Sequence, residues 1–133
     1  MSQKIKIEDL PVTDKFLRQK RLIQDRGELA LIEDGKDFQH LGYFSLKSGK
    51  GLYRGGHYHR KKVEHFYIIS GRLVIQLVDL DSGTKSNVTL HEGQRVVIYT
   101  NCAHRFMAEK DAQVIEYYDC RYDPEDDVPY NDF

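Results

Sequence analysis

Short apolar segments separated by turn residues run through most of the chain. Ser70-Gly71 and Asp81-Ser82-Gly83 are typical of tight turns between such segments. Many short strands at roughly even spacing indicate an all-β sandwich or barrel. The predicted strands are Leu29–Ile32, Leu41–Leu46, His65–Ile69, Leu73–Val78, Val88–His91, Val96–Thr100, His104–Ala108 and Gln113–Tyr118.

One short helix is expected, from Asp14 to Leu22. The three prolines lie near the chain ends, so residues 26–122 contain none. An uninterrupted set of paired strands is compatible with that, because proline cannot donate a hydrogen bond to a neighbouring strand.

Several predicted strands are apolar on both faces. Phe66–Ile69 shows no alternation, and Val74–Val78 is interrupted only by Gln76. A barrel interior buries one face, so the other needs a second sheet, the N-terminal segment or a partner subunit as cover. We expect a homodimer, since two-fold pairing is the commonest closed assembly. Residues 1–25 are expected to form an extension that packs on the barrel or on a partner.

The length of 133 residues predicts a single domain, residues 1–133. Lys and Arg number 20 against 21 Asp and Glu, and this balance argues against a partner that is nucleic acid or a membrane surface. The sequence shows neither an apolar run of about 20 residues nor the apolar core of a signal peptide. We expect a cytoplasmic protein in which Cys102 and Cys120 stay reduced.

Four residues form a candidate metal site: His57, His59, Glu64 and His104. Period-two geometry on a strand points His57 and His59 to the same face. Three imidazoles and a carboxylate suit a divalent Zn, Fe, Mn, Ni or Cu ion, and the spacing does not select among them. A single histidine is more often a surface or core residue, and we assign that role to His40, His65 and His91.

The segment from Gly51 to Gly71 resembles the first cupin motif. Five residues follow Gly51, then come His57-Tyr58-His59, four residues, Glu64, six residues and Gly71. A weaker second motif runs from Gly93 to His104, with Tyr99, Asn101 and Ala108 at positions where proline, glycine and asparagine are usual. The resemblance implies a double-stranded β-helix, the cupin jelly-roll barrel, with the four metal-ligand side chains converging inside it.

A narrower resemblance concerns cupins that act on nucleotide-linked keto-deoxysugars. Asp25–Leu29, Arg54–His59 and the acidic tail Tyr122–Asp127 are similar, in that order, to segments of dTDP-sugar 3,5-epimerases, 3,4-ketoisomerases and the cupin domain of hexulose reductases of capsule synthesis. The resemblance implies an isomerase or epimerase of a keto sugar or sugar nucleotide, with Arg26 and Arg54 binding substrate. Glu64 departs from this resemblance. It completes a His-His-Glu-His set that is typical of metal-binding cupins, whereas many of these epimerases and isomerases work without metal.

Such a reaction moves a proton next to a ketone. Without metal, His57 or His59 is the candidate base. A ligating imidazole cannot act as a base in the same step, so a metal-loaded site needs another group, and Tyr117, Tyr118 and Glu116 are candidates. The alternative role for both tyrosines is core packing. Arg54 suits a substrate phosphate, or else a surface ion pair.

Two other functions fit the same fold, because a cupin barrel hosts many activities. One is a different metal-dependent cupin enzyme, such as a dioxygenase or a small-sugar isomerase. The other is a non-catalytic cupin that binds a metal or a small ligand.

Overall fold

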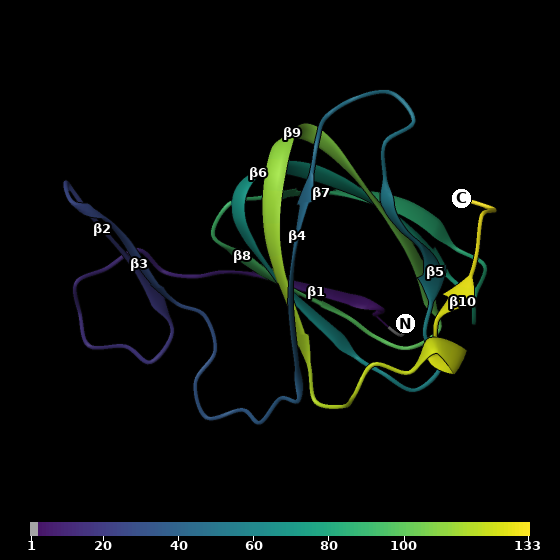
Figure 1. Cartoon of the computed structure of the whole chain (residues 1–133), viewed down its shortest axis with the longest axis horizontal. Coiled ribbons are helices and arrows are strands. Elements are labelled where there is room, and N and C mark those ends of the chain that lie inside the picture. The colour runs from purple at the N-terminus through teal and green to yellow at the C-terminus, as the bar shows by residue number, and fades with distance from the viewer. Residues whose placement is uncertain (1–2) are drawn as a thin grey trace.

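The computed structural model describes residues 3–133 and consists almost entirely of strands (Figure 1). A curved sheet has the strand order β1-β8-β6-β9-β5-β10, with β4 also pairing with β9 and β7 with β6. The strands β2 and β3 form a separate two-stranded hairpin. The bounds are β1 Ile5–Asp9, β2 Lys20–Gln24, β3 Gly27–Leu31, β4 His40–Leu46, β5 Arg54–Tyr58, β6 Glu64–Asp79, β7 Lys85–His91, β8 Gln94–Ile98, β9 Cys102–Tyr118 and β10 Val128–Pro129, with a 3-10 turn at Pro124–Asp126. This architecture confirms the predicted all-β jelly-roll barrel.

The strands β6 and β9 are long and bent, and they pair from His65–Tyr117 to Asp79–Cys102. The predicted turn at Ser70-Gly71 is wrong, because the register shifts there while the strand continues as a bulge. Gly71 has φ 93°, and a Cβ atom there would lie 2.6 Å from Ala112 Cα. Glycine therefore allows the two bent strands to stay in contact at their bend.

The interior is filled by alternate residues of these strands. Leu73, Ile75 and Leu77 point into one apolar cluster with Leu90 and Phe106. The strand β4 shows the same alternation, with His40, Gly42 and Phe44 more buried than Leu41 and Tyr43. Side chains at alternate positions of β4 therefore face the barrel.

The helix expected from Asp14 to Leu22 is wrong. Residues 14–19 form bends and irregular chain, and Lys20–Gln24 forms β2 in antiparallel register with β3. A nine-residue helix is marginal unless one of its faces is buried. Phe16 and Leu17 are instead exposed, whereas pairing with β3 satisfies the backbone of residues 20–24.

The N-terminal segment has two parts. The first, β1, adds a strand to the barrel by pairing with β8. The second, the hairpin β2–β3, projects from one side of the barrel in Figure 1, and Arg21 on β2 contacts Glu92 in the turn before β8. Among residues 3–133, no helix has the length and hydrophobicity that crossing a bilayer requires. Cys102 is buried and Cys120 is half-buried, and both are free thiols.

Candidate metal centre and cavity

A cavity of about 490 Å³ opens at one end of the barrel. Its walls come from β4, β5, β6 and β9 and from the C-terminal tail. Polar and aromatic side chains surround it, including all four predicted metal ligands. A cavity of this size, with a few convergent polar groups, is typical of a small-molecule site.

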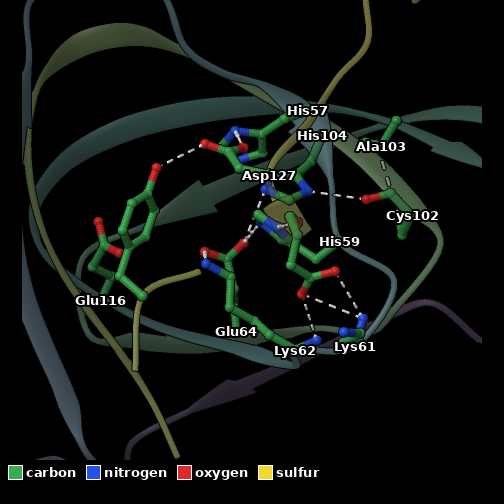
Figure 2. Close-up of polar contacts among 12 residues, drawn as sticks. His57, His59, Lys61, Lys62, Glu64, Cys102, Ala103, His104, Glu116 and Asp127 are labelled. Atoms are coloured by element: carbon green, nitrogen blue, oxygen red, sulfur yellow. Dashed lines mark hydrogen bonds and ion pairs between the residues drawn. The ribbon is translucent and has the colours of Figure 1, made fainter. Parts of the chain in front are cut away.

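The four predicted ligands converge in this cavity. His57 lies on β5 and His104 on β9, where the two residues are direct partners in the register. His59 follows β5, and Glu64 begins β6. One ligand atom from each residue lies within 4.8 Å of every other. Figure 2 shows the four side chains pointing toward one another. The structure therefore brings the four predicted ligands together, and their binding of a metal ion stays a prediction.

The contacts of His59 and His104 leave their Nε2 atoms pointing at Glu64. The Nδ1–H of His59 donates to the Asp126 carbonyl at 2.7 Å, and that of His104 donates to the Cys102 carbonyl at 3.0 Å. A carbonyl only accepts, so each neutral ring carries its proton on Nδ1 and a lone pair on Nε2.

Three acceptor atoms then meet in the buried interior. His59 Nε2 and His104 Nε2 lie 3.0 Å and 3.1 Å from Glu64 Oε1, and none of the three atoms makes a hydrogen bond of regular geometry. Facing lone pairs repel unless a cation lies between them. A proton on a ring or a divalent metal ion satisfies this arrangement, and Nδ1–carbonyl bonds are the usual outer contacts of metal-bound histidine.

The electrostatics of Glu64 and His59 agree with this demand for a cation. Burial opposes the charge of Glu64, but His104 and His59 outweigh it and hold the pKa of that carboxyl well below its usual range. Burial likewise opposes the charge of His59, and Glu64 outweighs it and raises the pKa of the ring. The carboxylate is therefore ionised and available as a ligand.

His57 has a different partner. Its Nδ1 lies 2.7 Å from Asp127 Oδ1, and Asp127 comes from the acidic tail (Figure 2). Burial, together with the neighbouring His104 and His59, lowers the pKa of His57 to about 4. The ring is therefore neutral near pH 7, and its Nε2 lone pair is available to a metal ion.

Asp126 organises the loop between His59 and Glu64. Its carboxylate accepts hydrogen bonds from the backbone N–H groups of Arg60, Lys61 and Lys62 at 2.8 to 3.3 Å. Burial raises the pKa of Asp126, but these three donors outweigh it and lower the pKa overall. The loop places the Lys62 ammonium 4.1 Å from the ring centroid of Tyr118 and 3.9 Å from Glu64 Oε2.

The two neighbouring tyrosines point to opposite faces of β9. Tyr118 and Glu116 line the cavity with the metal ligands. Tyr117 does not, and instead stacks on His65 in a separate cavity of about 530 Å³ on the outer face. The structure therefore brings Tyr118 and Glu116 to the site and leaves Tyr117 outside it.

The two predicted substrate-binding arginines also separate. Arg54 lines the cavity, where its Nε–H donates to the Ser45 carbonyl at 2.9 Å and its guanidinium lies over Phe44. Arg26 lies in the turn of the β2–β3 hairpin, where it donates to Gln24. Figure 1 shows this hairpin on the opposite side of the molecule from β5 and β10.

Three cavity residues were missed or misassigned in the sequence. His40, assigned to the surface or core, lines the cavity beside Glu116. Asp127 contacts His57, and the sequence pointed to it only through the resemblance of the acidic tail Tyr122–Asp127 to the sugar-nucleotide cupins. Lys62 has no local signal, because a lysine in a basic run such as Arg60-Lys61-Lys62 is usually exposed.

A family model described as the polysaccharide biosynthesis C-terminal domain matches residues 23–127. The chain belongs to this family. The match includes all four converging residues and the acidic tail up to Asp127. No curated protein matches the chain.

Solved structures share the fold of this member of the family at low sequence identity. QdtA, a sugar 3,4-ketoisomerase from Thermoanaerobacterium thermosaccharolyticum in complex with TDP, has a TM-score of 0.78 at 18% identity, covering 100% of this chain and 93% of its own. WlaRB, a TDP-quinovose 3,4-ketoisomerase from Campylobacter jejuni, has 0.73 at 18%, covering 96% and 94%. A dTDP-4-dehydrorhamnose 3,5-epimerase from Sulfolobus tokodaii has 0.71 at 19%, covering 96% and 82%. These likenesses confirm the fold that the cupin motifs predicted.

Proposed function

We propose that this protein is an isomerase or epimerase of a nucleotide-linked keto sugar, acting by proton transfer next to the carbonyl group. The observation that carries the proposal is the carboxylate-paired, neutral His57 in a cavity of about 490 Å³. Enzymes named as 3,4-ketoisomerases and 3,5-epimerases of TDP sugars share the fold over nearly the whole chain, which supports this substrate class.

The proposal includes a divalent metal ion held by His57, His59, Glu64 and His104. The three buried acceptor atoms that meet without regular hydrogen bonds support this ligand set. Asp127, Asp126 and Cys102 support the ring orientations, since each contacts an Nδ1 atom of a ligand histidine. When bound, the ion supplies Lewis-acid stabilisation of a developing enediolate oxygen.

The identity of the residue that acts as the base depends on whether a metal ion is bound. Without metal, His57 is the better candidate than His59, because both nitrogens of His59 already face Asp126 and Glu64. Asp127 then orients His57 and stabilises the imidazolium that forms. With metal bound, the lone pair of His57 is engaged and a different group must take the proton.

The substrate nucleotide needs positive charge near the cavity mouth. Arg54 lines the cavity and has a guanidinium that matches a phosphate bidentately. Lys62 adds a second positive charge deeper in the cavity, beside Tyr118. The two side chains suit a phosphate and a sugar hydroxyl or enediolate oxygen, respectively.

The proposed assembly is a homodimer. A two-stranded hairpin such as β2–β3 is marginally stable alone, and it carries exposed Ile23, Leu29 and Leu31. Leu41 and Tyr43 on the outer face of β4 are also exposed. A second copy that covers these apolar side chains removes a patch that monomers rarely tolerate. Sedimentation at micromolar concentration tests this, and a purely monomeric species contradicts it.

The test of function is elemental analysis of the purified protein followed by a screen of keto-sugar nucleotides. We expect about one ion per chain by the four-ligand argument, and conversion of at least one TDP- or UDP-linked keto sugar. Oxygen consumption without sugar turnover would contradict the isomerase proposal and favour an oxygenase. Turnover by fully metal-free protein would support the isomerase function and contradict the proposed role of the metal.

A further inference from the structure

The cavity contains a second histidine–carboxylate pair, separate from the metal ligands. His40 Nε2 on β4 lies 3.3 Å from Glu116 Oε2 on β9. Both side chains line the cavity and keep about a quarter of their surface exposed, so a ligand can reach them. Neither belongs to the converging group of four. His40 therefore remains a free nitrogen base when the other three histidines of the cavity hold an ion.

Two contacts fix the ring of His40. It stacks on Tyr118 with ring centroids 4.1 Å apart and planes 6° from parallel, which sets the plane of the imidazole. Glu116 lies beside Nε2 and favours the ring flip that turns this nitrogen toward the carboxylate. A ring held in both respects is pre-organised for proton transfer, in contrast to a histidine free to rotate in solvent.

Gly42 provides the space for the pair. It is the direct partner of Glu116 in the register and lies two residues from His40, on the same face of β4. A Cβ atom at position 42 would lie 3.2 Å from His40 Nε2 and 3.0 Å from Glu116 Cγ. Both contacts are tighter than ordinary van der Waals packing, so any larger residue would displace the pair.

The carboxylate determines which nitrogen can act as the base. A negative charge beside Nε2 favours the proton on that atom, which leaves the lone pair of the neutral ring on Nδ1. The same carboxylate stabilises the imidazolium that forms when Nδ1 takes a proton. This is the arrangement of an oriented general base.

We propose that His40 is a further catalytic residue of this cavity and that Glu116 is its positioning residue. The inference rests on the proposed function and names the proton-transfer group of that same site. His40 Nδ1 takes the proton from the carbon next to the keto group as that C–H bond breaks. The electron pair forms the carbon–carbon double bond of an enediolate, and the former carbonyl pair moves onto oxygen.

Return of the proton completes the reaction and regenerates neutral His40. The imidazolium protonates the former carbonyl carbon, and the hydroxyl proton of the neighbouring carbon passes to the other oxygen. The keto group has then moved by one carbon with all atoms and electrons balanced. His40 ends in the protonation state in which it began.

The test uses the protein as purified, with TDP-4-keto-6-deoxyglucose, a ligand of one structural neighbour, in deuterium oxide. Proton NMR follows both sugar conversion and deuterium uptake next to the keto group. The matched control is His91→Gln, because His91 also faces a carboxylate, Asp9 at 3.9 Å, but lies outside the cavity. Elemental analysis of each variant keeps metal loss separate from loss of the base.

We expect His40→Gln to lower kcat by about 100-fold or more, the usual contribution of general acid–base catalysis. Deuterium uptake should fall in parallel, while KM and metal content stay within about twofold of wild type, since the metal ligands are untouched. His91→Gln should leave all four quantities unchanged. Free imidazole should restore part of the activity of His40→Ala but none to Glu64→Gln.

Glu116→Gln should lower kcat by about tenfold with KM nearly unchanged, because Glu116 acts through His40. The double variant of His40 and Glu116 should then be no slower than His40→Gln alone, which a merely structural role would not produce. Wild-type kcat in His40→Gln, or a loss of activity that follows loss of metal, overturns the inference. If wild-type protein converts no keto-sugar nucleotide, the proposed function fails and this inference fails with it.

Discussion

Two histidine–tyrosine stacks lie back to back on β9, one on each face of the barrel wall. Inside, His40 stacks on Tyr118 at 4.1 Å beside Glu116. Outside, His65 stacks on Tyr117 at 5.1 Å. The two tyrosines are adjacent in sequence and both are buried, so composition and burial do not distinguish them.

The surroundings of the two stacks differ. The inner stack shares a cavity with the four converging residues that are predicted to bind a metal and with Lys62. The outer stack shares its cavity with Arg95, which pairs with Glu8 and Glu33. Arg95 and Lys6 are engaged in ion pairs with Glu8 and Glu33, whereas the inner cavity holds converging acceptors that require a cation. We therefore propose a chemical role for the inner histidine–tyrosine pair and a structural role for the outer one.

The largest expected difference between the two faces is in metal binding. Replacing both His57 and His59 with Ala removes two of four ligands, and bound metal should fall from about one ion per chain to a trace. The control is His65→Ala on the outer face, which should keep the full metal content. Elemental analysis measures both, and circular dichroism checks that the fold remains. Full metal content in the double variant would contradict the proposed ligand set.

The next largest expected effect is a loss of stability, and it concerns the loop that lies between the two faces of the barrel wall. Lys61 lines the outer cavity and Lys62 the inner one, and Asp126 holds the backbone of both. Asp126→Ala leaves these N–H groups without their acceptor and should cost about 2 kcal/mol of unfolding free energy. Urea denaturation measures this, with the exposed Asp132→Ala as the control that should change little.

The same carboxylate predicts a pH dependence. The pKa of Asp126 is lower in the folded protein than its ordinary value of 3.8, so its stabilising contribution is present above that pH and is lost as the pH falls through the folded pKa. In Asp126→Asn the acid limb of the stability curve should be shallower. Equal acid limbs in both proteins would show that Asp126 is not held as an anion.

A pair of tyrosine variants compares the stacks directly. Tyr118→Leu removes the surface that sets the plane of His40 and should lower kcat by about tenfold, because the proposed base is no longer held. Tyr117→Leu should leave kcat within about twofold, since its ring lies outside the cavity. Both should lose stability to a comparable degree, because each buries one aromatic ring. A larger loss of kcat from Tyr117→Leu would reverse the assignment of the two faces.

The smallest effect concerns alkaline pH. Burial, and to a lesser extent Glu33, raises the pKa of Tyr117 to about 12. An unfolded tyrosine ionises near pH 10, so its stabilising contribution is present below pH 10 and is lost between about pH 10 and 12. Tyr117→Phe should remove about 1 kcal/mol of the pH dependence of stability at pH 11. Denaturation at pH 8 and pH 11 measures the difference.

The cupin motif predicted the site well, because period-two geometry and motif spacing are local or nearly local properties. His57 and His59 share a face of one strand, and the jelly-roll register brings His104 directly opposite His57. The strand boundaries at Ser70-Gly71 were wrong, because a glycine at positive φ marks either a turn or a bulge. Only the pairing of β6 with β9 over their whole length selects the bulge.

The sequence by itself determined the barrel, most of its core strands and the four residues that converge. Alternation of apolar side chains and fixed motif spacing specify these through short-range geometry. The tertiary structure alone decided that His40 belongs to the cavity and Tyr117 does not, and that Asp127 contacts His57. Those contacts join residues far apart in the chain, and their meeting depends on the register of β4 with β9 and on the path of the tail. Neither the register of these strands nor the path of the tail produces a periodic pattern in a single sequence.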